Sequence, residues 1–120
     1  MRDDGRPLFA QIAEQIENSV VDGSLAEEAQ VPSTNELAAF HRINPATAAK
    51  GVNRLVADGV LYKRRGIGMF VATGARTVLL DRRREEFARL YLAPLLAEAR
   101  KLGIDAEQVK KMIDISGEGE

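Results

Sequence analysis

The chain contains no cysteine among its 120 residues, which excludes disulfide bonds, thiolate chemistry and zinc sites built on cysteine. It has a single histidine, His41, so a metal site would depend on carboxylates, and we expect no metal and no cofactor. Its apolar runs are a few residues long, far short of the roughly 20 that span a bilayer. Residues 1–6 lack the apolar core of a signal peptide. We therefore expect a cytoplasmic protein with no membrane partner.

A strong net charge is also missing: the formal charge is -1 at pH 7, although proteins that bind nucleic acids commonly carry a basic patch. The charges are unevenly distributed. Between His41 and Arg65 the single acid is Asp58, whereas the basic residues are Arg42, Lys50, Arg54, Lys63, Arg64 and Arg65. This segregation can present a cationic face on an acidic body. By itself it fits a solvated surface as well as a phosphate-binding one.

Three consecutive helices are predicted in the first half of the chain. Leu8, Ile12, Ile16 and Val20 recur every four residues, as on the buried face of one helix. The segment 33–36 is a capping box, with Ser33 as N-cap, and begins a short helix. Asn44 followed by Pro45 begins the next helix, which Gly59 ends. The two capped helices fit a helix-turn-helix, although an ordinary helical corner has the same signals.

A basic hairpin is predicted directly after these helices. The β-prone runs 60–64 and 69–72 are joined by Arg65-Gly66-Ile67-Gly68. Glycines permit a close approach to a phosphate backbone and arginines supply positive charge. The order of elements predicts a winged helix-turn-helix DNA-binding domain over residues 1–75.

Residues 76–120 are predicted to form a two-helix dimerisation region. Their apolar band consists of Leu79, Leu80, Phe87, Leu90, Tyr91, Leu95 and Leu96. Because the winged helix already has a core, we expect this band to meet its equivalent in a second chain, although it could fold back on its own domain. Pro94 predicts a kink or break near residues 92–93. The fold class is thus mainly α with a small β-hairpin wing.

Four motifs, in order, resemble the GntR family of bacterial regulators. They are PLFAQIAEQI (7–16), VPSTNELA (31–38), INPATAAKGVNRLVADGVL (43–61) and KRRGIGMFV (63–71). The Asn-Pro-Ala-Thr start of the third helix and the short C-terminal part are most similar to the YtrA-type subfamily. The resemblance implies a dimeric transcriptional repressor on a near-palindromic operator in double-stranded DNA, and no enzymatic activity.

The resemblance also implies where DNA is contacted: by the start of the second helix, by the recognition helix and by the wing. Base edges would be read at the N-terminal end of the recognition helix, and phosphates met by backbone amides, hydroxyls and cations. With the basic residues added from charge, the expected contact residues are Ser33, Thr34, Asn35, Asn44, Pro45, Ala46, Thr47, Lys50, Arg54, Arg64, Arg65 and Gly66.

The chain departs from the family pattern at several positions. Many members have arginine where Asn35 stands, so we expect Asn35 to read adenine, with Thr47 or Ala46 packing on a thymine methyl in an A/T-leaning half-site. Glu28 replaces a common glycine, which predicts a different turn before the second helix. Gly51 lies inside the recognition helix, where it costs about 1 kcal/mol relative to alanine, and this indicates a close helix–helix crossing.

The sequence argues against two other functions. An enzyme would need a nucleophile with its base, a carboxylate pair or a cofactor loop, and none stands out. A winged helix can also serve as a protein-interaction module without a DNA role, but the basic wing and the polar helix starts argue against that. A small-molecule effector stays open: a ligand could lodge at the dimer interface or between that interface and the winged helix.

Overall fold

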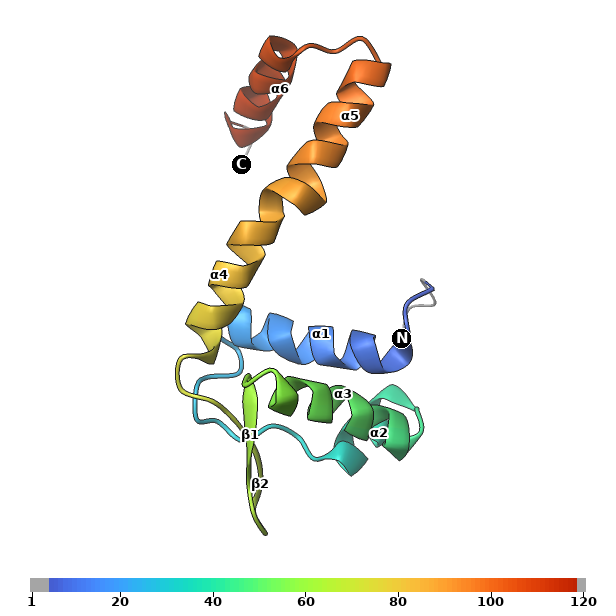
Figure 1. The fold of residues 1–120 in the computed structure, drawn as a ribbon, viewed down its shortest axis with the longest axis vertical. Helices are drawn as coiled ribbons and strands as arrows, with labels where there is room; N and C mark the ends of the chain where they lie inside the picture. The colour runs from blue at the N-terminus through green and yellow to red at the C-terminus, as the bar shows by residue number, and fades with distance from the viewer. Residues whose placement is uncertain (1–4, 119–120) are drawn as a thin grey trace. The chain divides into compact units, whose positions relative to one another are not determined.

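The computed structural model describes residues 5–118, and Figure 1 shows its helices and its single hairpin along this part of the chain. The elements are α1 (Leu8–Val21), α2 (Thr34–His41), α3 (Pro45–Ala57), β1 (Leu61–Arg64), β2 (Gly68–Val71), α4 (Ala75–Phe87), a π-helical turn η1 (Ala88–Leu92), α5 (Ala93–Lys101) and α6 (Ala106–Glu118). A mainly helical fold with a β-hairpin wing is confirmed.

The chain divides into two compact units, Met1–Asp81 and Arg82–Glu120. We call their described parts the winged-helix unit (residues 5–81) and the C-terminal unit (residues 82–118). The division falls later than the predicted boundary between residues 75 and 76. The reason is that Ala75 and Leu79, on the first turns of α4, belong to the hydrophobic core of the winged-helix unit.

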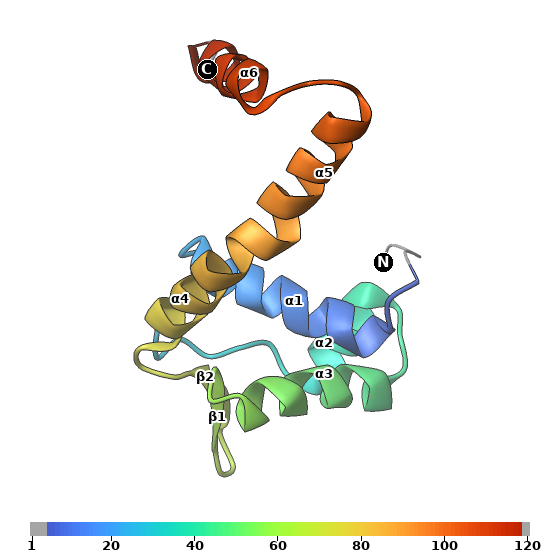
Figure 2. The same ribbon diagram turned by 45° about the horizontal axis from the view of Figure 1, so that its top comes forward.

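The core of the winged-helix unit is built on the apolar stripe of α1. Ile12, Ile16 and Val20 are buried, whereas Leu8, at the first turn, is exposed. The stripe packs against Val52 and Leu55 on the inner face of α3. Figures 1 and 2 both show α3 running beside α1 with α2 next to the start of α3.

The predicted helix starts are confirmed by their hydrogen bonds. The Ser33 hydroxyl accepts from the Glu36 amide at 3.1 Å, and the Glu36 carboxylate accepts from the Ser33 amide at 3.1 Å. The Asn44 side chain accepts from the Ala46 amide at 2.8 Å, with Pro45 in the first position of α3. These caps satisfy amides that have no partner within the helix, so each helix begins at a defined residue.

Gly51 lies where α3 crosses α1. A Cβ atom at this position would stand 2.7 Å from the Phe9 carbonyl oxygen and 3.1 Å from the Ile12 Cγ2 atom. Only glycine leaves room for that approach, so the close helix–helix crossing expected from the sequence is confirmed.

The wing is an antiparallel hairpin in which Leu61 pairs with Val71 and Arg64 with Gly68. The segment 28–31 runs beside β2: the Val31 amide donates to the Met69 carbonyl at 2.9 Å, and the Val71 amide donates to the Ala29 carbonyl at 3.0 Å. Leu61 and Val71 are buried, so the base of the hairpin is anchored in the core. Its tip projects away from α1 (Figures 1 and 2).

The C-terminal unit begins in a helix whose pitch changes ahead of Pro94. The π-helical turn η1 (Ala88–Leu92) precedes α5, and Pro94 occupies the first turn of that helix. A proline lacks the amide hydrogen that a regular helix needs, and a wider turn accommodates its ring. The break predicted near residues 92–93 is therefore a π-helical turn, not an interruption of the helix.

A groove of about 570 Å³ separates α5 from α6 in the C-terminal unit. Its walls are apolar and include Leu95, Leu102, Ile104, Met112 and Ile113. Among the described residues, no helix combines the length and the apolar character required to cross a membrane.

Candidate nucleic-acid interface

The residues predicted to contact DNA all lie at the surface of the winged-helix unit. Thr34 and Thr47 are half-buried and the others are exposed. They occupy the start of α2, the start and outer side of α3, and the wing: Ser33, Thr34, Asn35, Asn44, Pro45, Ala46, Thr47, Lys50, Arg54, Arg64, Arg65 and Gly66. The fold thus brings the three expected regions onto one unit, and the individual contacts stay predictions.

The outer face of α3 contains one further polar residue, Asn53. Ala48, Val52 and Leu55 are buried, and successive residues of a helix are turned by about 100°. Ala46, Lys50 and Asn53 therefore share the face opposite the core, and Asn53 is exposed. Its amide can bond to base edges. The expected contact residues, taken from the family resemblance and from charge, do not include Asn53. Its helical spacing from Ala46 and Lys50 would have identified it.

Two of the predicted DNA-binding cations lie over aromatic rings. The Lys50 ammonium is 4.1 Å from the centre of the Phe9 ring, and the Arg64 guanidinium is 4.9 Å from the centre of the Phe70 ring. A ring face attracts a cation without neutralising its charge. Both side chains are thus oriented by the fold while their positive charge stays available to a phosphate.

The N-termini of α2 and α3 differ in their electrostatics. Glu36 lies in the first turn of α2, and the Ser33 amide and hydroxyl donate to its carboxylate and lower its pKa. This negative charge occupies the positive end of the helix dipole. The first turn of α3 contains no acidic residue. Of the two helix starts, that of α3 is therefore better suited to an anionic phosphate.

The Glu28 side chain forms hydrogen bonds at the base of the wing, and its backbone is strained. Its φ is +65°, in the left-handed region that glycine adopts without strain. The backbone thus has a conformation that suits a glycine, and the different turn expected from the sequence stays a prediction. The carboxylate accepts hydrogen bonds from the Tyr62 hydroxyl and, at 2.7 Å, from the Thr73 hydroxyl. These bonds join the segment before α2 to β1 and to the segment that follows β2.

Replacing Glu28 with glutamine is expected to flatten the acid side of the pH–stability profile. The Tyr62 and Thr73 hydroxyls hold the pKa of Glu28 below its ordinary value of 4.5. A lowered pKa in the folded state stabilises the fold above the unfolded value, and this gain is lost as the pH falls through the folded value. Thermal unfolding from neutral pH to below 4.5 measures the difference.

Glu27→Gln is the matched control, since the exposed neighbour Glu27 makes neither of these hydrogen bonds. The same flattening in both variants would contradict a specific role of Glu28.

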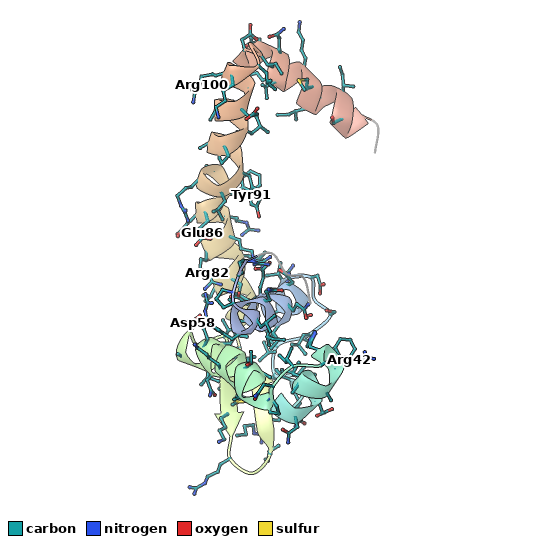
Figure 3. All side chains as sticks on the ribbon, turned by 90° about the vertical axis from the view of Figure 1, so that its right-hand side faces the viewer. Arg42, Asp58, Arg82, Glu86, Tyr91 and Arg100 are labelled. Carbon is teal, nitrogen blue, oxygen red and sulfur yellow. The ribbon has the colours of Figure 1, made fainter. Side chains whose placement is uncertain are left out.

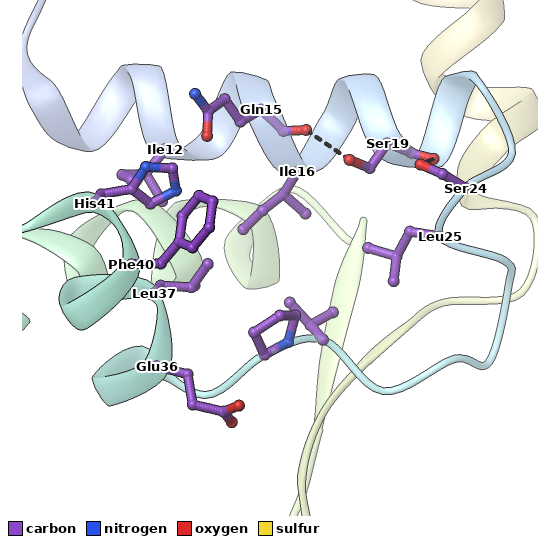
Figure 4. A pocket seen from close by; sticks show the side chains of 12 residues that line it. Ile12, Gln15, Ile16, Ser19, Ser24, Leu25, Glu36, Leu37, Phe40 and His41 are labelled. Atoms are coloured by element: carbon purple, nitrogen blue, oxygen red, sulfur yellow. Dashed lines mark hydrogen bonds between the residues drawn. The ribbon is translucent and has the colours of Figure 1, made fainter. Parts of the chain in front are cut away.

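A groove of the winged-helix unit lies between α1 and α2 (Figure 4). Its volume is about 480 Å³, and Ile12, Ile16, Leu37, Phe40 and His41 are among its lining residues. Burial lowers the pKa of His41, which favours the neutral imidazole. The ring of His41 packs edge-on against that of Phe40, at 4.9 Å between centres. His41 therefore packs against Phe40 at the C-terminal end of α2.

The predicted dimerisation residues differ in their exposure to solvent. Phe87, Leu90, Tyr91 and Leu95 are exposed apolar side chains, and Leu80 is half-buried. Figure 3 shows the Tyr91 side chain projecting from the helix, on a different side from Glu86. The prediction is wrong for Leu79, which is 0% exposed and packs in the winged-helix core, on the same face of α4 as Ala75. A second chain cannot reach it.

Residues 8–71 match the sequence model described as bacterial regulatory proteins, gntR family. The HTH-type transcriptional repressor YtrA of Bacillus subtilis is 26% identical to this chain, over 89% of the chain and 82% of the repressor. The crystal structure of a transcriptional regulator from Oenococcus oeni is 30% identical, with a TM-score of 0.78 over 95% of this chain and 93% of that one. The DNA-binding domain of AraR in complex with operator ORR3 is 33% identical, with a TM-score of 0.52 over 53% of this chain and 77% of that one.

Proposed function

Because the chain belongs to the gntR family of bacterial regulatory proteins, and is therefore a DNA-binding transcriptional regulator, we propose that it is a homodimeric repressor acting on a near-palindromic operator in the cytoplasm. One observation carries the proposal: the capped starts of α2 and α3 and a basic wing lie on a single unit. That unit has the fold of a domain crystallised with operator DNA. A repressor of similar sequence supports repression over activation.

In this proposal α3 enters the major groove and the wing meets the sugar–phosphate backbone beside it. Asn35, Thr47 and Asn53 are exposed or half-buried polar groups that can read base edges. Lys50 and Arg65 supply charge for phosphates. The short neutral side chains on the first turns of α3, in place of guanidinium groups, favour an A/T-leaning half-site.

Dimerisation is supported by the apolar surface of the C-terminal unit. Phe87 and Tyr91 are 60% and 64% exposed, and Met112 and Ile113 on α6 are also exposed. Apolar side chains gathered on one small unit are typical of a surface that a partner covers. A second copy related by a two-fold axis would present two winged helices to half-sites about one helical turn of DNA apart, or a multiple of it.

Replacing Arg65 with alanine is expected to weaken binding to every DNA sequence by about fivefold per wing, because a phosphate contact carries no base information. The dependence of log affinity on log salt should become shallower by about 1 per wing. Replacing Asn35 with alanine should instead change which sequence binds best. Fluorescence anisotropy at two salt concentrations measures the affinity and its salt dependence. Comparing DNA selected from a random pool with a scrambled duplex measures the sequence preference.

Arg100→Ala is the control for charge, since Arg100 is an exposed arginine of the C-terminal unit outside the predicted interface. Unchanged affinity in Arg65→Ala would contradict a wing contact. An equal loss on selected and scrambled DNA in Asn35→Ala would contradict base reading by that residue.

A further inference from the structure

The side chain of Gln30 reaches from the segment before α2 to the tip of the wing. Its Nε2 atom donates a hydrogen bond to the Ile67 carbonyl oxygen at 3.1 Å, between residues 37 positions apart in the chain. The backbone of Gln30 is held at the same place, because Gln30 pairs with Phe70 in an antiparallel bridge. The neighbouring Val31 amide donates to the Met69 carbonyl at 2.9 Å. The backbone beside the hairpin is thus fixed, and the side chain extends that contact to the tip.

Gly68 provides the space in which the Gln30 amide lies. A Cβ atom at position 68 would stand 2.6 Å from the Gln30 Nε2 atom. The φ of Gly68 is +148°, which residues with a side chain rarely adopt. The glycine and the glutamine therefore form a matched pair: the missing side chain of one leaves room for the donor of the other.

The carbonyl group that Gln30 binds belongs to the turn that presents Arg65. The Ile67 amide donates to the Arg64 carbonyl at 2.9 Å and closes this turn, with Arg65 and Gly66 between them. At its other end, Gln30 is followed after Val31 and Pro32 by Ser33, the N-cap of α2. One side chain therefore ties the wing tip to the start of α2, two regions that are expected to touch the same DNA.

We propose that Gln30 is a positioning residue for DNA binding: it holds the wing tip at a set distance from α2, so that Arg65 meets the backbone while α2 and α3 engage the groove. This inference rests on the wing contact of the proposed function. A two-stranded hairpin without this tie would have to be ordered when DNA binds, and ordering costs affinity. Gln30 reduces that cost because the turn is already held in the free protein.

Gln30→Met tests the role, since methionine keeps the length and the neutrality of the side chain and removes the donor. The affinity for selected DNA should fall by about threefold per wing, the effect of one hydrogen bond, and so by about ninefold for a dimer. In an Arg65→Ala background the same substitution should cause no further loss, because Gln30 acts through Arg65. Backbone order parameters of residues 65–68 in the free protein should fall.

Gln15→Met is the matched control, because Gln15 is an exposed glutamine on α1 outside the predicted DNA interface. Equal losses from Gln30→Met with and without Arg65 would overturn the positioning role and indicate a direct contact of Gln30. The positioning role would also be overturned if Gln30→Met bound DNA with full affinity while Arg65→Ala bound it more weakly. If Arg65→Ala itself binds normally, the wing contact fails, and the role of Gln30 fails with it.

Discussion

Replacing Leu79 with alanine is expected to lower the free energy of unfolding of the winged-helix unit by about 2 to 5 kcal/mol. The side chain is fully buried in the core of that unit, so its removal leaves a cavity that the surrounding helices fill only in part. A domain of this size loses about 4–8 °C in melting temperature per kcal/mol. Thermal unfolding followed by circular dichroism would therefore show a fall of roughly ten degrees or more.

Leu90→Ala is the matched control, since Leu90 is the same residue type, lies further along the same helical run and is 46% exposed. It should leave the unfolding of the winged-helix unit within about 0.5 kcal/mol of the parent chain. In sedimentation equilibrium it should weaken self-association. If Leu79→Ala dissociated the dimer and left the unfolding temperature unchanged, Leu79 would be an interface residue after all.

Gly51→Ala is expected to destabilise the winged-helix unit by about 2 kcal/mol, although alanine favours a helix over glycine by about 1 kcal/mol. The sign follows from the atom that the new methyl group meets. A Cβ atom would stand 2.7 Å from the carbonyl oxygen of Phe9, which belongs to the backbone of α1 and cannot rotate away. The helices must separate, and the packing between them is lost. Denaturant unfolding at equilibrium measures the change.

Gly117→Ala provides the comparison, because Gly117 lies in α6 and a Cβ atom there would have no neighbour within 4 Å. There the preference of alanine for the helix acts without a steric cost, so the substitution should be neutral or slightly stabilising. A gain of stability in both variants would mean that α1 and α3 can move apart at no cost, and would contradict a tight crossing.

DNA binding should also suffer in Gly51→Ala, because the crossing positions the recognition helix. Phe9 contributes both the carbonyl that Gly51 accommodates and the ring beneath the Lys50 ammonium. A shift of α1 at this point moves the ring away from the cation. The stability of the unit and the orientation of a predicted phosphate contact are therefore coupled through one residue of α1.

The sequence alone determined the elements whose signals are local. The capping box at Ser33, the start at Asn44 and Pro45, and the hairpin around Gly66 each depend on groups within a few residues of one another. Such signals act within a short segment before any tertiary contact forms, so the sequence alone is enough to recognise them. The order of these elements was sufficient to predict a winged helix.

The tertiary structure alone decided which side of each element meets the rest of the protein. Leu79 and Leu90 look alike in the apolar pattern, yet the first is in a core and the second is exposed, because the winged-helix unit extends into α4. Glu28 and Gln30 reach the wing across more than thirty positions of sequence, a separation at which no local pattern indicates a partner. Spacing along the chain specifies helices and turns, whereas burial and long-range hydrogen bonds depend on how those elements pack.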